Sequence, residues 1–220
     1  MLGKLKSTEF RLNFFFALFV ASVILSNMMG GKVSELNLFG IPVIFSVGLV
    51  PFFLTFFLLD SINEVYGKQK AREMIWATML VLVFVSIITM IAVALPYAGR
   101  SWVKPEQFSA VFGSGIRIIF ASLAAFILAD LMDARVFGIL QEKTKGKMLW
   151  LRSNISNFIS QTIDTFVFMF LAFYDPATNH DAGFVLALII PYLTLKLILS
   201  VVNTPFVYAG VRFLKGGAAK

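Results

Sequence analysis

The sequence has no cysteine, one histidine and little charge for its length. Without cysteine, disulfides, thiolate metal sites and cysteine nucleophiles are excluded. The single histidine, His180, lies in the polar segment YDPATNHDAG with no second histidine or cysteine beside it. We therefore expect a loop residue rather than a metal ligand, and we expect no metal site and no cofactor. Only 14% of the 220 residues are charged, which is too few for a soluble protein of this size.

Several enzyme signatures are also missing. The chain has no Gly-x-x-x-x-Gly-Lys-Ser/Thr loop for nucleotide phosphates, no His-Glu-x-x-His metal motif and no Gly-x-Ser-x-Gly nucleophile turn. One histidine and no cysteine leave few groups for acid–base catalysis near neutral pH. We therefore expect no enzymatic activity, and a membrane-embedded enzyme or a structural membrane protein ranks last among the alternatives.

Hydrophobic residues dominate what is present. They make up 59% of the chain, which has 25 phenylalanines and a mean hydropathy of +0.85. Apolar runs of this length predict an all-α membrane protein, because a helix satisfies its own backbone hydrogen bonds in lipid. The expected architecture is a single domain, residues 1–220, with six transmembrane helices. These are expected at about residues 10–30, 42–62, 73–95, 108–131, 153–174 and 184–213.

The net charge of +7 indicates membrane topology rather than nucleic-acid binding. If the N-terminus is cytoplasmic, fourteen of the 19 Lys and Arg residues fall in inner loops and tails, and three fall in outer loops. Basic residues concentrate on the cytoplasmic side of membrane proteins. Both termini are therefore predicted to be cytoplasmic, with the chain surrounded by membrane lipid.

The fifth segment carries polar side chains inside an apolar run. Asn154, Asn157, Gln161 and Asp164 fall within one stripe about 80° wide on a helix of about 100° per residue. Amides and a carboxylate in hydrocarbon require partners or a cavity. Because Asn154 lies near the cytoplasmic end, where water reaches it, the deeper three are the predicted site residues, with Asp164 first.

Carboxylates also share one face near the end of the second segment. Asp60 and Glu64 are four residues apart in LLDSINEVYGKQKAR, so a cation, a proton or a donor-rich substrate is expected between them. The alternative is that these acids pair with Lys68, Lys70 or Arg72 in the inner loop. Asn27, at the outer end of the first segment, is either a helix-capping amide or a substrate contact.

Two basic residues are predicted to lie within the membrane. Arg117 in the fourth segment should face a carboxylate, helix-end carbonyls or a wet cavity. Lys196 in the sixth segment shares a stripe with Ser200 and Asn203, at about 40° and 340° from it. Balancing two cations against Asp164 calls for another acid such as Asp60, a bound anion, a π-rich ligand or a neutral lysine, and a purely structural ion pair is the alternative.

Four strings identify a resemblance that covers nearly the whole chain. LLDSINEVYGKQKAR, GSGIRIIFASLAAFILADLMDARVF, RSNISNFISQTIDTFVF and LKLILSVVNTPFVY together resemble the queuosine precursor transporter family. The resemblance implies a six-helix bacterial or archaeal inner-membrane importer of a 7-deazaguanine base. It also implies an architecture similar to the substrate-binding subunits of energy-coupling-factor vitamin importers.

The polar residues suit such a base. A guanine-like edge offers donors that a carboxylate accepts and a carbonyl that Arg, Asn or Gln can bind. The expected site lies near the membrane midplane among the second, fourth, fifth and sixth helices. Its residues are Asp164, Gln161, Asn157, Arg117, Lys196, Asp60, Glu64, Asn27 and Asn203. The alternative is a substrate-capture subunit that docks on separate ATPase and coupling proteins. The preferred precursor, the coupling ion, the stacking aromatic and the choice between monomer and homodimer stay open.

Overall fold

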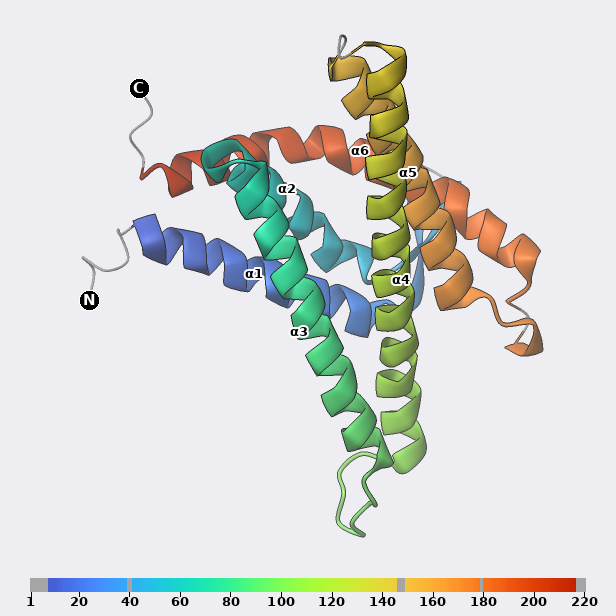
Figure 1. The fold of residues 1–220 in the computed structure, drawn as a ribbon. Helices are drawn as coiled ribbons and strands as arrows, with labels where there is room; N and C mark the ends of the chain where they lie inside the picture. Colours follow the sequence, from blue (N-terminus) through green and yellow to red (C-terminus); the bar gives the residue numbers. More distant parts are fainter. Residues whose placement is uncertain (1–7, 39–40, 146–148, 179, 217–220) are drawn as a thin grey trace. The chain divides into compact units, whose positions relative to one another are not determined.

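In the computed structural model of the chain, the described residues are 8–38, 41–145, 149–178 and 180–216. They form six α-helices and one β-hairpin (Figure 1). The elements in chain order are α1 (Thr8–Met29), β1 (Val33–Leu38), β2 (Ile41–Ser46), α2 (Leu49–Tyr66), α3 (Lys68–Ala94), α4 (Pro105–Lys143), α5 (Leu149–Phe173), the short 3-10 helix η2 (Pro176–Thr178) and α6 (Ala182–Leu214).

The chain divides into two compact units. The first unit comprises the residues before Arg117 together with those from Thr194 onward, and the second unit comprises Arg117–Leu193. Helices α4 and α6 therefore contribute residues to both units. Each unit has its own set of packed side chains.

Phenylalanine rings pack α1, α2 and the last part of α6 together in the first unit. The buried ring of Phe15 in α1 lies edge-on to Phe57 of α2, with 6.2 Å between ring centroids. The same ring stacks on Phe213 of α6 at 5.6 Å. A further edge-on pair joins Phe53 of α2 to Phe206 of α6 at 5.7 Å. Such pairs contribute about 0.5–1.5 kcal/mol each beyond the burial of their area.

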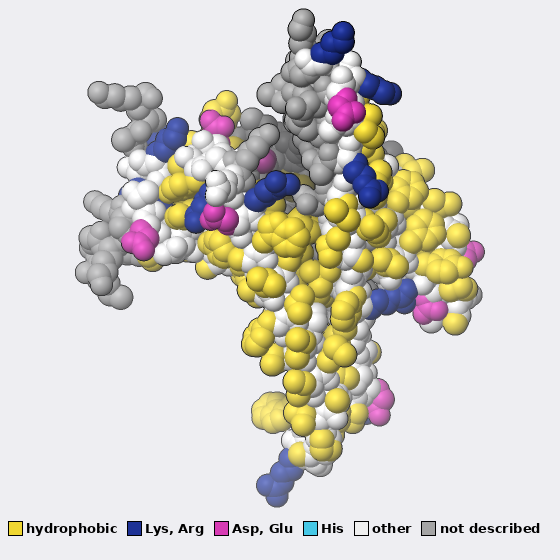
Figure 2. Space-filling model, viewed as in Figure 1, with side chains coloured by type: hydrophobic (Ala, Val, Ile, Leu, Met, Phe, Trp, Pro, Cys, Tyr) yellow, Lys and Arg dark blue, Asp and Glu magenta, His cyan; other side chains and the backbone are white. Residues whose placement is uncertain are grey.

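Helix α3 turns its large apolar side chains outward. Trp76, Leu80, Phe84, Ile87 and Ile91 recur every three or four residues and are all exposed. Hydrophobic side chains accordingly cover the visible surface of α3 in Figure 2.

The opposite face of α3 carries Met74, Thr78, Leu82 and Ser86, and it is buried. The Thr78 and Ser86 hydroxyls donate to the carbonyls of Met74 and Leu82, at 2.8 and 2.9 Å. A helix that buries small hydroxyl residues and exposes large apolar ones is suited to hydrocarbon surroundings rather than to water.

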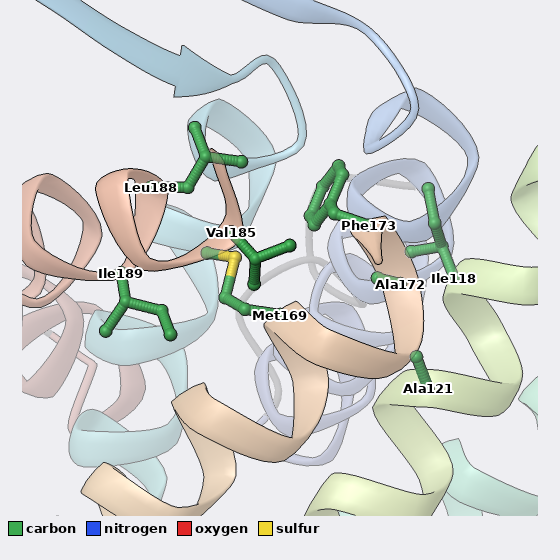
Figure 3. Packing of buried hydrophobic residues seen from close by; sticks show 8 residues of the cluster. All are labelled: Ile118, Ala121, Met169, Ala172, Phe173, Val185, Leu188 and Ile189. Atoms are coloured by element: carbon green, nitrogen blue, oxygen red, sulfur yellow. The ribbon is translucent and has the colours of Figure 1, made fainter. Parts of the chain in front are cut away.

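The core of the second unit is made by α4, α5 and α6 (Figure 3). Met169 of α5 and Val185 of α6 lie next to each other at its centre, whereas Ile118 of α4 lies at one side, near Ala172 of α5. Met169, Val185 and Ile118 are almost fully buried. The remaining members are Ala121, Ala172, Phe173, Leu188 and Ile189. These side chains pack together residues from three helices that are far apart in the sequence.

The β-hairpin follows α1 directly. Its strands pair antiparallel, from Val33 opposite Ser46 to Leu38 opposite Ile41. The Ser46 hydroxyl donates to the Gly30 carbonyl at 2.8 Å, which ties the end of β2 to the end of α1.

The hairpin corrects the predicted start of the second helix. Residues 42–46 of the expected segment 42–62 are extended, and the helix begins only at Leu49. A hydropathy window reads apolar strands and apolar helices alike. The β-branched residues of IPVIFS favour a strand, and Pro42, which has no backbone N–H, is unfavourable in a helix interior.

The other predicted segments each overlap one helix, with shifted ends. Helix α4 runs to Lys143, well past the predicted end at 131, because no proline interrupts the polar continuation. Among the described residues, four helices are long and apolar enough to cross a membrane: α1, α2, Gln69–Ala94 and Pro105–Ala129. The described apolar parts of α5 and α6, Phe158–Phe173 and Ala182–Thr194, are shorter. The chain is therefore a helical membrane protein, and six crossings remain a prediction.

A single glycine separates α2 from α3. Gly67 has φ +85° and ψ 168°, a combination that is essentially restricted to glycine, and its N–H donates to the Asn63 carbonyl at 3.0 Å. This residue lets the chain reverse between two helices without a longer loop.

Replacing Gly67 by alanine should destabilise the protein through backbone strain alone. A Cβ at residue 67 meets nothing within 4 Å, so the expected loss of about 1–3 kcal/mol comes from φ. Gly138→Ala is the matched control, because that site in α4 is also open but helical, and it should gain up to about 1 kcal/mol. Thermal unfolding of the purified protein in detergent measures both. Equal melting temperatures for the two variants would contradict this account.

Candidate functional site

A polar pair joins α2 to α6 within the first unit. The Asn203 amide nitrogen donates to a carboxylate oxygen of Asp60 over 3.2 Å. Asn203 is 2% exposed, whereas Asp60 is exposed. Among the described residues, the amide oxygen Oδ1 of Asn203 is buried and accepts no hydrogen bond. The two predicted site residues Asp60 and Asn203 thus come together.

Two small residues allow the helices to approach this closely. The Ser61 hydroxyl, next to Asp60, donates to the Val207 carbonyl of α6 at 3.4 Å. A Cβ at Gly210 would collide with the Ser61 hydroxyl and lie 3.1 Å from the Ser61 Cβ. Because Asn203, Val207 and Gly210 are spaced by four and three residues, they lie on one face of α6. Ser61 and Gly210 were not predicted from the sequence, although small residues at such spacing are a general signal for close helix packing.

A lysine and an aromatic ring form a second contact between the same helices. The Lys196 ammonium lies 5.7 Å from the centroid of the Phe52 ring, which is the geometry of a cation–π interaction. Phe52 precedes Asp60 by eight residues, or about 12 Å of helix. Lys196 precedes Asn203 by seven, so both helices run in the same direction along their contact. An aromatic ring as the partner of Lys196 was not predicted from the sequence, and the ring that stacks on the base stays open.

Glu64 and Asn27 have less distinctive surroundings. Glu64 is exposed, one turn beyond Asp60, and Lys70 donates to Glu73 at 2.9 Å instead of pairing with it. Asn27 is buried and donates to the Val23 carbonyl of its own helix at 2.8 Å. Because Val23 lies six residues before the end of α1, this bond is within the helix and is not a helix cap. Both interpretations of Asn27 therefore stay predictions.

Arg117 binds backbone carbonyls at the end of α5 in the second unit. Its Nε donates to the Leu171 carbonyl at 2.9 Å and its Nη2 donates to the Tyr174 carbonyl at 2.5 Å. The last carbonyls of a helix lack intrahelical partners and carry partial negative charge, so a guanidinium is a favourable cap. Helix-end carbonyls were one of the three surroundings expected for Arg117.

The polar stripe of α5 is described only in part. Gln161 is exposed, and its backbone carbonyl accepts a hydrogen bond from the Thr165 hydroxyl at 2.9 Å. Asp164 is half-buried and lies near enough to Tyr192 of α6 to interact with its hydroxyl electrostatically. The backbone of Asn157 is helical, but its side chain lies outside the described residues. A substrate contact by these residues therefore stays a prediction.

The described residues offer few groups for metal binding or acid–base chemistry. No group of three or more His, Asp or Glu side chains that could hold a metal ion occurs among the described residues. His180 lies in the turn between α5 and α6, with its ring stacked on Phe184 at 4.6 Å between centroids.

Comparisons with known proteins point to one family. A family profile described as "Putative vitamin uptake transporter" matches residues 46–210. The chain is 30% identical over 186 residues to the "Probable queuosine precursor transporter" of Bacillus subtilis, covering 83% of this chain and 77% of that protein. It is 28% identical over 130 residues to the "Queuosine precursor transporter" of Escherichia coli, covering 58% of this chain and 54% of that protein. No solved structure matches the chain.

Arg117→Met should destabilise the second unit. It removes both side-chain hydrogen bonds to the end of α5, and hydrogen bonds from a charged donor contribute about 1.5–3 kcal/mol each. We expect a lower melting temperature in detergent, with Arg117→Lys intermediate because an ammonium cannot reproduce the guanidinium geometry. The control is Arg100→Met, in the exposed turn before α4. An unchanged melting temperature for Arg117→Met would contradict the capping role.

Gly210→Ala should separate α2 from α6. The added methyl collides with the Ser61 side chain, and overpacking of this kind costs about 1–3 kcal/mol. Adding Ser61→Gly to the same chain should recover most of the lost stability, because it vacates the space that the methyl needs. Gly113→Ala, at an open helical position, is the control. A double variant as unstable as Gly210→Ala alone would show that the Ser61 contact does not set the helix spacing.

Proposed function

The chain belongs to the putative vitamin uptake transporter family, and from that premise we propose that it imports a queuosine precursor, a 7-deazaguanine base. The family consists of transporters, so the chain is not an enzyme, and it is a multi-pass membrane protein. The names of the relatives from Bacillus subtilis and Escherichia coli support the substrate class.

The observation that carries the binding part of the proposal is the Asp60 carboxylate held by Asn203. Asp60 lies six residues, or about 9 Å, before the end of α2, where a carboxylate facing lipid would be costly. An exposed carboxylate at this depth is suited to the ring N–H and amino donors of a guanine-like base. We place the donor edge of the base on Asp60.

The second contact between α2 and α6 lies nearer the start of α2. The ring of Phe52, beside the Lys196 ammonium, provides an apolar surface. This contact lies about 12 Å along α2 from Asp60, too far for Lys196 to bind the carbonyl oxygen of a base whose ring N–H lies on Asp60, so a contact of Lys196 with the substrate would be to another acceptor group. Phe56 packs edge-on against Phe52, with 5.1 Å between centroids, and lies between it and Asp60 along α2. The proposed site therefore runs along one face of α2. Substrate contacts by Arg117, Gln161, Asn157 and Asp164 remain part of the wider proposal.

The direction of the helices supports the proposed topology. If each of six helices crosses the membrane once, α2 and α6 must run in the same direction, as their contacts require. We propose that the chain lies in the inner membrane of a bacterium or archaeon, with both termini cytoplasmic, as the distribution of basic residues indicates.

Transport by the purified protein tests the proposal. The chain, reconstituted alone in liposomes, should take up or exchange a radiolabelled 7-deazaguanine precursor. Binding without uptake, with transport restored by ATPase and coupling proteins, would favour the substrate-capture alternative. Neither uptake nor binding of such a base would overturn the proposed function.

Asp60→Asn should weaken substrate binding without unfolding the protein. The amide removes the charge and one acceptor, so the apparent affinity for the base should fall about ten- to a hundredfold. The variant Glu106→Gln, an exposed acid in the first turn of α4, is the matched control and should transport normally. Concentration-dependent uptake in cells that cannot synthesise the precursor measures both, with expression checked. Normal uptake by Asp60→Asn would remove Asp60 from the site.

A further inference from the structure

The orientation of the Asn203 amide is fixed by Asp60. With its nitrogen toward the carboxylate, the amide donates at 3.2 Å, whereas a flipped amide would place its oxygen against a negative charge. The oxygen Oδ1 is therefore the atom that accepts no hydrogen bond from the described residues. Asn203 is 98% buried, so the orientation is not an effect of free rotation in solvent.

A buried acceptor without a donor is unfavourable, by about 1–3 kcal/mol. A leucine at residue 203 would fill a similar volume without that penalty. The amide nitrogen alone does not explain an asparagine here, because a buried side chain with one satisfied end still leaves the other unpaired. An unsatisfied group of this kind calls for a functional partner, and in a transporter the substrate can be such a partner.

We propose that Asn203 selects substrates with an exocyclic amino group next to a ring N–H, an inference that rests on the proposed function. Such an amino group has two hydrogens. One can bind Asp60 together with the ring N–H, in a bidentate contact to the carboxylate. The second is then left for Oδ1 of Asn203, which is joined to the same carboxylate. Asp60 and Asn203 together accept three adjacent donor hydrogens of the base, one from the ring N–H and two from the amino group.

The consequence is discrimination against bases that lack the amino group. A 7-deazahypoxanthine keeps the ring N–H and the carbonyl but offers no donor to Oδ1. The asparagine oxygen then stays unpaired in the complex. A site binds an analogue much more weakly when that analogue leaves a buried polar group unpaired. We expect at least about tenfold weaker binding of the deaminated analogue, a difference of about 1.4 kcal/mol.

The burial of Oδ1 agrees with a transport cycle. Alternating access requires that groups contacting the substrate be closed off in some states and open in others. Asp60, the exposed member of the pair, is the first contact for an arriving base. The neighbouring Ser61 and Gly210 hold α2 and α6 together, so a small shift along this contact would uncover the amide.

Equilibrium binding to the purified full-length chain tests the inference. The probes are 7-deazaguanine and 7-deazahypoxanthine, measured on the wild type, Asn203→Leu and the control Asn63→Leu, an exposed position one turn further along α2. The wild type and the control should prefer the amino base at least about tenfold. Asn203→Leu should lose the part of that preference that comes from Oδ1, by binding the amino base more weakly and the deaminated base as before. The part that comes from the Asp60 carboxylate should remain.

Each other outcome overturns the inference. Equal binding of the two bases by the wild type does so even if the variant fails to fold. A preference in folded Asn203→Leu that is as large as in the wild type also does so. Binding that requires sodium but ignores the amino group does so too, because it would assign the oxygens to a cation. Failure of the proposed function looks different, because the wild type would then neither bind nor transport 7-deazaguanine.

Discussion

A carboxylate inside an apolar helix needs a polar partner, and in the first unit that partner is reached only because α2 and α6 nearly touch. The contact of Ser61 with Val207 and Gly210 brings the helices close enough for Asn203 to donate to Asp60. Without small side chains at this crossing, the two polar residues would stay apart, each at a high energetic cost in lipid. The polar pair and the close packing therefore depend on each other.

The same requirement is met differently in the second unit. Arg117 is an equally costly side chain, but it binds the carbonyls of Leu171 and Tyr174 rather than a carboxylate. Those carbonyls lack partners because α5 ends there, so one side chain satisfies both the arginine and the helix end. Because two of its donors bind these carbonyls, the contacts of Arg117 indicate a structural role, whereas its charge alone indicates binding to an anion. Lys196 lies over the Phe52 ring, and its flexible side chain can adjust to a ligand more easily than the guanidinium of Arg117 can.

The sequence predicted the helical membrane character and the family because both depend on local properties. Apolar runs of membrane length and long family strings need no tertiary information. The strand at 42–46 was missed because hydropathy is blind to the difference between an apolar strand and an apolar helix. Asp60 and Asn203 were each identified as candidate site residues, but their pairing could not be predicted. Periodicity orders residues around one helix and contains no information about which neighbouring helix they face.

The pairing changes which part of the chain we propose for substrate recognition. The α5 stripe with Asp164 has the most polar residues in sequence, whereas the α2–α6 contact has the defined geometry. A row of amides can be satisfied in many ways, by helix carbonyls, by water or by neighbours. A buried amide whose nitrogen is committed and whose oxygen is not has far fewer solutions. Because selectivity arises from polar groups that only the right ligand can satisfy, we propose the constrained pair as the stronger determinant of which base is bound.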